Sequence, residues 1–251
     1  MKKKLTVAAL VIALIGIAVG GTLAWFSDTD ETTNVFTVGS VDIEQKEVFD
    51  EDTAQLLPIV GADPTVTTDN YIEKKVVVAN VGKNDAYVQT YVAVPTVLDS
   101  NGILKLYDGN LAEKGWTKVD GDVALDGVQP VATGVSITGE TLLYNVYLYR
   151  YNSILPTDTN NETTACLEYV YIDSSIDLNT YDKKDAEGNL GTDGVKDTAY
   201  FVLSDGTEIT DFDAAGKLNV YVATQGVQAK GFANAEAALT SAFPNHPWMT
   251  E

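Results

Sequence analysis

Short segments with the residue alternation of a β-strand recur along this chain, and they restrict its fold more than any other feature. Over residues 87–94, Val and Thr at the even positions alternate with Tyr, Gln and Ala at the odd positions, which indicates a strand with one buried face. Further strand-like segments lie at residues 75–79, 115–119, 131–137, 142–149, 167–172, 199–203 and 218–222. Because turns rich in Gly, Asn and Asp separate them and no helical crossover joins them, the sequence predicts an all-β fold, a jelly-roll-like antiparallel β-sandwich.

Local patterns refine this prediction. The two strands on either side of the turn at residues 80–85 are predicted to pair as a hairpin. The segment at residues 142–149 is apolar on both faces, which predicts a central strand. The polar stretches at residues 50–70 and 177–197 are interpreted as long surface loops.

One short helix is predicted near the C-terminal end of the sequence. Asn234 is a suitable N-cap, and Pro244 ends the helix. Between them, apolar side chains recur on one face at helical spacing: Ala235, Ala238, Leu239, Ala242 and Phe243. We expect this face to pack on the sandwich or to cover a sheet edge.

The N-terminal residues predict export. Three lysines at residues 2–4 precede an apolar run at residues 5–19, and a Gly-Gly-Thr break follows. This order is typical of a secretory signal peptide, with an uncleaved membrane anchor as the alternative. We place the signal peptide at residues 1–24 and one β-sandwich domain at residues 25–251. The predicted cleavage region consists of Thr22, Leu23, Ala24, Trp25 and Phe26, with the cut after Ala24.

The cleavage region belongs to a longer pattern. Gly-Gly-Thr-Leu-Ala-Trp-Phe-Ser-Asp at residues 20–28 is followed by Phe-Thr-Val-Gly-Ser-Val-Asp-Ile at residues 36–43. This pattern resembles the export region of the TasA/camelysin family of Gram-positive bacteria. A weaker likeness to the same family continues in Val-Val-Val-Ala-Asn-Val-Gly at residues 76–82.

The resemblance implies several properties. They are processing by a SipW-type signal peptidase, a jelly-roll sandwich, and secretion to the extracellular matrix or the cell surface, where members often form biofilm fibres. Camelysin-type members have been classed as metallopeptidases. After cleavage, we expect no membrane association.

The residues themselves do not predict an enzyme. A zinc peptidase needs a cluster of ligands, commonly His, and a general base. This chain has one histidine, His246, one cysteine, Cys166, and no His-Glu-x-x-His motif. Cys166 lies in an apolar run and is interpreted as a small buried residue. No catalytic, cofactor-binding or metal-binding residue is therefore predicted, and a secreted peptidase is the least favoured function.

The charge of the chain excludes several partners. With 36 acidic and 16 basic residues, the net charge is −20, which disfavours nucleic acid and anionic lipid. Two acidic clusters suit calcium by ligand type. They are Asp182, Asp185, Glu187, Asn189 and Asp193, and Asp205, Glu208, Asp211 and Asp213. We favour solvated loops for both clusters, so no cofactor is predicted and Ca²⁺ remains the alternative.

A run of tyrosines lies in the predicted central strand: Tyr144, Tyr147, Tyr149 and Tyr151. Aromatic rings on one face of a strand are able to stack on sugars. Tyr144 alternates to the face opposite the other three. We favour packing within the sandwich, with the hydroxyl groups reaching its rim.

The N-terminal segment of the mature chain is the candidate for subunit contacts. Residues 26–48 are rich in Thr, Val and Phe, and the candidate donor-strand residues are Phe36, Val38, Val41 and Ile43. A terminal strand is easily exchanged between copies, and head-to-tail exchange builds a filament. Together with the resemblance to the TasA/camelysin family, this strand character predicts an exported structural subunit, a homo-oligomer or filament. The alternative is a non-catalytic surface module that binds a cation, a glycan or a host partner.

Overall fold

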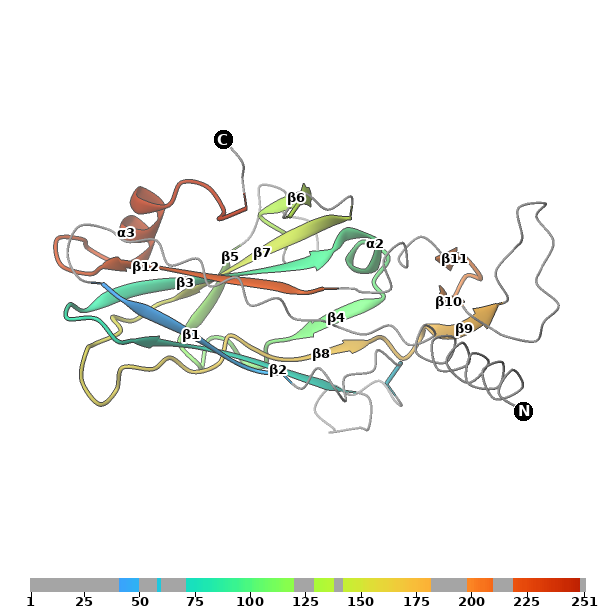
Figure 1. The fold of residues 1–251 in the computed structure, drawn as a ribbon, viewed down its shortest axis with the longest axis horizontal. Helices are drawn as coiled ribbons and strands as arrows, with labels where there is room; N and C mark the ends of the chain where they lie inside the picture. The colour runs from blue at the N-terminus through green and yellow to red at the C-terminus, as the bar shows by residue number, and fades with distance from the viewer. Residues whose placement is uncertain are drawn as a thin grey trace, which may run out of the picture.

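A computed structural model describes residues 41–49, 58–59, 71–119, 129–137, 142–181, 198–209 and 219–248. Its strands form two main antiparallel sheets and one small sheet (Figure 1). The first, here the β1 sheet, has the order β1 (Ile43–Val48), β2 (Ile72–Asn80), β8 (Leu167–Ile172) and β4 (Leu104–Tyr107). The second, here the β12 sheet, has the order β12 (Tyr221–Gln228), β3 (Ala86–Pro95), β7 (Leu143–Tyr151) and β5 (Trp116–Val119), and β6 (Ala132–Ser136) also pairs with β7.

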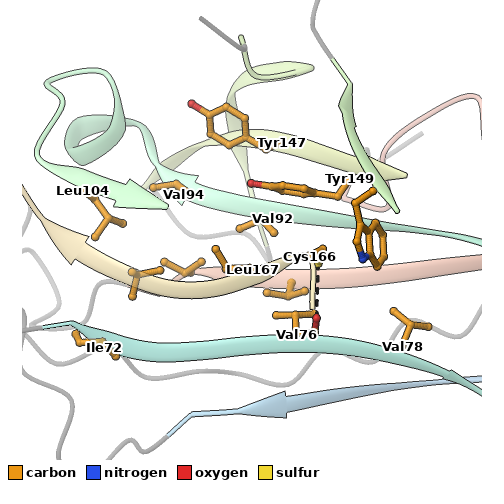
Figure 2. Packing of buried hydrophobic residues seen from close by; sticks show 14 of the residues in the cluster. Ile72, Val76, Val78, Val92, Val94, Leu104, Tyr147, Tyr149, Cys166 and Leu167 are labelled. Carbon is orange, nitrogen blue, oxygen red and sulfur yellow. Dashed lines mark hydrogen bonds between the residues drawn. The ribbon is translucent and has the colours of Figure 1, made fainter. Parts of the chain in front are cut away.

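The two main sheets face each other across one hydrophobic core. Val76 and Leu167 of the β1 sheet contact the same buried cluster as Val92 and Tyr149 of the β12 sheet (Figure 2). Alternate residues of each strand point into this core because side chains in a strand alternate between its faces. The predicted all-β sandwich is confirmed.

The small sheet has the order β11 (Glu208–Ile209), β10 (Thr198–Val202) and β9 (Asp177–Tyr181). Phe201 of β10 is fully buried in the same hydrophobic cluster as the main core. The sequence placed a strand near β10 correctly. It assigned residues 177–181 to a loop, which is wrong, because they form β9; residues 182–197 lie outside the described residues. The other predicted loop, at residues 50–70, also lies outside them apart from residues 58–59.

The predicted hairpin between β2 and β3 is wrong. β2 pairs with β1 and β8, whereas β3 pairs with β12 and β7, so the turn between them crosses from one sheet to the other. The buried Asn80 holds this turn. Its Nδ2 donates to the carbonyl oxygens of Asn84 and Leu155, both at 2.9 Å, and its Oδ1 accepts from the backbone N–H of Gly82 at 3.1 Å. A short polar turn is typical of both arrangements, so the sequence did not distinguish them.

Strand β3 is more buried than its alternation predicts. All ten of its residues are buried, because a second layer covers the outer face of the β12 sheet. This layer contains β6, the C-terminal helix α3 (Ala235–Ala242) and Trp248. β7 is likewise covered on both faces over most of its length, which confirms the prediction of a central strand.

Helix α3 confirms the predicted capped helix. The Oδ1 atom of Asn234 accepts a hydrogen bond from the backbone N–H of Ala237 at 2.9 Å, as an N-cap does. Ala235, Ala238 and Leu239 are buried against β3 and β12 on the outer face of the β12 sheet. A second helix, the single turn α2 (Thr96–Asp99), was not predicted.

Strand β12 continues beyond the predicted segment. The sequence placed a strand at residues 218–222, but β12 spans Tyr221–Gln228. Its polar Thr224 and Gln225 are buried, and Gly226 is required by close packing. A Cβ atom at Gly226 would lie 2.9 Å from Cγ2 of Ile43 on β1. Polar residues and glycine resemble a loop in sequence, and only the facing strand shows why they lie inside a sheet.

Candidate functional site

Strand β1 is the described part of the candidate donor segment. It lies at the edge of its sheet, and among the described strands its backbone pairs with β2, from Ile43 opposite Asn80 to Val48 opposite Lys75. The backbone N–H of Val81 donates to the carbonyl oxygen of Asp42 at 2.9 Å, which extends this pairing by one residue. β1 is therefore held along one edge.

Two of the candidate donor-strand residues lie in or directly before the start of β1. Val41 and Ile43 are buried in the core, with 5% and 7% of their surface exposed, whereas Asp42 and Glu44 are exposed. The other two candidate donor-strand residues, Phe36 and Val38, lie outside the described residues. So does the whole predicted cleavage region: Thr22, Leu23, Ala24, Trp25 and Phe26.

Beyond Ile43, the inner face of β1 is polar. The hydroxyl of Thr224 on β12 donates to Oε1 of Gln45 at 2.7 Å, and the hydroxyls of Thr224 and Thr90 lie 3.1 Å apart. These contacts connect β1 to the facing sheet. Because hydrogen bonds depend on direction as well as distance, they fix the position of β1 along β12 more narrowly than apolar contacts would.

An ion pair lies next to this polar contact. Nζ of Lys74 on β2 is 2.7 Å from Oε2 of Glu47, and 2% and 10% of these two side chains are exposed. Gln45 Nε2 donates to Oε1 of the same carboxylate. Nζ of Lys74 also lies 4.9 Å from the centre of the Phe49 ring. A one-residue slip of β1 would move Glu47 to the outer face, so this pair fixes the register of the strand.

The single cysteine and the single histidine lie in different parts of the fold. Cys166 is fully buried between the sheets, where its thiol donates to the carbonyl oxygen of Val76 at 3.8 Å (Figure 2). Burial raises the pKa of this thiol to about 12, so it is not a thiolate at neutral pH. His246 lies on the outer face of the β12 sheet, near Trp248.

The described residues do not fit a metal centre. Within them, no group of three or more His, Cys, Asp and Glu side chains is placed to hold an ion. Of the two acidic clusters, only Asp205 and Glu208 are described. Asp205 accepts from the backbone N–H of Thr207 at 2.9 Å, which lowers the pKa of its carboxyl group. Asp205 therefore stabilises a turn. The remaining residues of both clusters, apart from Glu208, lie outside the described ranges.

The tyrosine run packs within the protein. Tyr149 is fully buried and Tyr147 nearly so in the core between the sheets, while Tyr144 is buried on the opposite face of β7. The ring of Tyr151 packs on Trp116, with ring centres 5.1 Å apart. The predicted alternation is confirmed, and these rings form no exposed platform for sugars.

Sequence reasoning missed a lateral cleft of about 540 Å³, which lies where the β4 and β5 edges of the two sheets meet α2. The carboxylate of Asp99 accepts from the Tyr147 hydroxyl at 2.8 Å and from Nδ2 of Asn145 at 2.7 Å. The hydroxyl of Thr96 donates to Oδ1 of Asn145 at 2.9 Å, which fixes this amide. Lys118 of β5 also lines the cleft, with Nζ 4.5 Å from the centre of the Tyr147 ring.

The cleft offers polar groups that are held by hydrogen bonds. Burial and the nearby Asp99 carboxylate raise the pKa of Tyr147, so its hydroxyl stays protonated and donates to Asp99. Such convergent polar groups in a concave site are typical of ligand binding. Asp99 lies in α2, directly after β3, whereas Asn145 and Tyr147 both belong to β7, and the pairing of β3 with β7 brings them together.

Comparison with known proteins identifies the N-terminal segment. Residues 1–58 match the family model described as camelysin metallo-endopeptidase. The resemblance to the TasA/camelysin family is confirmed over this segment. β1 is the described strand within the matched TasA/camelysin segment. No curated protein and no solved structure matches the chain.

The described helices have no membrane-spanning character. Neither α2 nor α3 is long and apolar enough to cross a bilayer. The apolar run at residues 5–19 lies outside the described residues.

Proposed function

We propose that this protein is exported and acts outside the cell as a structural subunit of a matrix or surface fibre, in which copies exchange strand β1. The match to the camelysin model over residues 1–58 supports a secreted or surface-attached protein. The observation that carries the assembly is the position of β1. It is the first described strand, it lies at a sheet edge, and it belongs to the matched segment.

Exchange of β1 needs little net free energy. The strand donated by a neighbouring copy would form the same ladder with β2 that the resident strand forms. It would also restore the contacts of Gln45 with Thr224 and of Glu47 with Lys74. Each copy donates one strand and accepts another, so the contact is head-to-tail, and it builds a filament if the rotation between copies does not close.

A reversible lock between β1 and β2 tests this proposal. Val48 and Lys75 lie directly opposite each other in the ladder and on its outer face. Opposed residues of an antiparallel pair have Cα atoms about 4.5–5.5 Å apart, which suits a disulfide. The double variant Val48→Cys, Lys75→Cys would therefore close β1 onto its own β2 when oxidised as a dilute monomer.

The disulfide should have different effects when it forms in the monomer and when it forms in the filament. Electron microscopy should show filaments of the reduced variant and none after oxidation as a monomer. Oxidation of preformed filaments should instead join neighbouring copies, so that a ladder of multimers appears on a non-reducing gel. The single variant Val48→Cys controls for the substitution. Filaments of the locked monomer would exclude strand exchange.

A second function, a non-catalytic binding module, is favoured by the lateral cleft. Its Asp99, Asn145 and Tyr147 groups suit a ligand rich in hydroxyl groups, such as a glycan. Calorimetric titration with neutral oligosaccharides tests this, with Asn145→Ala as the variant that removes the fixed amide. Saturable heat that this variant abolishes would support binding; equal heat from both proteins would argue against the cleft.

A further inference from the structure

A second pocket lies on the outer face of the β12 sheet. It measures about 520 Å³ and is bounded by β3, β6, β7 and the residues that end and follow α3. Arg150 and His246 both line it. They are the only arginine and the only histidine in the sequence. The pocket therefore combines the single guanidinium of the chain with its single imidazole.

Several buried polar atoms around this pocket lack protein partners. Within the described part of the chain, four buried side-chain atoms have no hydrogen-bond partner: Gln89 Oε1, Arg150 Nε, His246 Nδ1 and Trp248 Nε1. Three of these side chains line the pocket, and the Trp248 ring packs against two lining residues, Tyr91 and His246. Buried polar atoms are nearly always hydrogen-bonded, so four such atoms around one pocket indicate a place for a polar ligand.

Neighbouring groups contact the side chains of Gln89 and Arg150 but leave Gln89 Oε1 and Arg150 Nε without a hydrogen bond. Nε2 of Gln89 donates to the Tyr91 hydroxyl at 3.0 Å and to Oε1 of Gln225 at 2.9 Å, which fixes the amide and leaves its own oxygen available. Arg150 lies 4.0 Å from Glu236, whose side chain is 78% exposed. Such an exposed, distant carboxylate neutralises the guanidinium weakly.

The protonation states around the pocket define its charge. Burial raises the pKa of Tyr91 to about 12, although the Arg150 charge acts in the opposite direction, so Tyr91 is a neutral hydroxyl. Burial lowers the pKa of His246, so its imidazole is neutral at pH 7 and above. Arg150 is therefore the single charge on the pocket wall, which matches a ligand with one negative charge.

The remaining wall is apolar: Val131, Ala132, Val135, Leu148, Phe243 and Pro244. From the single guanidinium, the unpartnered donors and acceptors and this apolar wall, we propose that the pocket binds a small monocarboxylic acid with an apolar body and an N–H or O–H group. The guanidinium of Arg150 donates to the carboxylate, because guanidinium and carboxylate match in shape and charge. Gln89 Oε1 accepts from the N–H or O–H group of the ligand.

The single histidine makes the test direct. The probe is N-acetyl-phenylalanine, which has a carboxylate, an amide N–H and an aromatic body, and its primary amide is the uncharged control. Each is titrated into the purified protein at pH 7.5 while the one Hε1 resonance of His246 is followed by NMR. We expect the acid to give a saturable shift and the amide to bind at least tenfold more weakly. No saturable shift with the acid, or equal affinity for both compounds, would overturn the proposal.

Two variants and one control locate the site. Arg150→Gln should reduce affinity for the acid at least tenfold and remove the preference over the amide. Lys118→Gln removes the same charge from the neighbouring strand β5 in the lateral cleft and should leave the affinity unchanged. Ala132→Phe fills the apolar side of the pocket and should abolish binding with Arg150 intact, which provides a second measurement if Arg150→Gln does not fold. Wild-type affinity in Ala132→Phe would also refute the site.

Discussion

The ion pair between Lys74 and Glu47 should contribute strongly to the attachment of β1. Its atoms are 2.7 Å apart and its side chains are 2% and 10% exposed. Removing one partner of a buried pair costs about 3–5 kcal/mol, because the other charge stays desolvated. In Glu47→Gln, Lys74 keeps its contact with the Phe49 ring at 4.9 Å, and the new amide still offers an oxygen to Gln45. We therefore expect the lower end, about 3 kcal/mol.

Urea unfolding of the monomer measures this loss. With a slope of about 3 kcal/mol per molar urea, the midpoint should fall by about 1 M. The double variant Glu47→Gln, Lys74→Met removes both charges and should recover most of the loss, since an apolar replacement of a buried pair is often neutral or stabilising.

The surface pair between Lys46 and Glu162 is the matched control. It lies on the outer face of the same strand at 2.5 Å, with 44% and 51% of the side chains exposed. Lys46→Met should leave the midpoint unchanged, because solvent screens exposed pairs. If Glu47→Gln lowered the midpoint no more than Lys46→Met, or if the double variant were as unstable as the single one, the ion pair would not hold β1.

Three further predictions concern export, chemistry and packing. The exported form should begin after Ala24, which N-terminal sequencing or intact mass determines; an uncleaved protein retained in the membrane would contradict the signal peptide. Cys166→Ala and His246→Ala should leave assembly intact, although the loss of a buried Cys166 costs up to about 2 kcal/mol in thermal or urea unfolding, and peptide substrates should not be turned over by any of these proteins. Gly226→Ala places a methyl group 2.9 Å from Ile43 and should cost about 1–3 kcal/mol; Ile43→Val in the same chain should restore part of this, and an unchanged melting curve would show that β1 adjusts without strain.

The strands and the C-terminal helix were predictable because their signals are local. Alternation marked β3, and an Asn cap with apolar residues at helical spacing marked α3. The partners of each strand were not predictable in the same way. The turn after Asn80 has the length of a hairpin turn, but its side-chain hydrogen bonds to Leu155 and Asn84 carry the chain into the other sheet. Leu155 is so distant from Asn80 in the sequence that this contact gives no local signal.

The two pockets could not be predicted from the sequence either, because their lining residues come from distant parts of the chain. Gln89 lies in a predicted strand, and nothing in the sequence indicates that this polar side chain is buried. Arg150 and His246 are almost one hundred positions apart. The only signal in the sequence was that arginine and histidine each occur once, which singled out these two residues as candidates for a shared site. The lateral cleft left a weaker signal, since Tyr147 belonged to the tyrosine run but Asp99 did not stand out among 36 acidic residues.

The polar inner face of β1 reconciles two requirements of the proposed exchange. A donated strand must be secure once docked, yet its release must not expose a long apolar stripe. Val41 and Ile43 supply apolar contact at one end only, and the following Gln45 and Glu47 are hydrogen-bonded and ion-paired instead. When the strand leaves, water can solvate these groups, so the open state is less prone to unspecific association than an all-apolar strand would be.

The same polar contacts would select the correct partner. Copies with a net charge of −20 repel one another, so assembly needs a specific attraction at the contact. In the open acceptor, Lys74 would offer a cation at the place of Glu47, and Thr224 a hydroxyl at the place of Gln45. A strand shifted by one residue would present Lys46 and Glu44 to the core and leave Glu47 outside. In the proposed exchange, the ion pair would specify both the register and the identity of the donated strand, a use of buried polar groups that is well documented in helical assemblies.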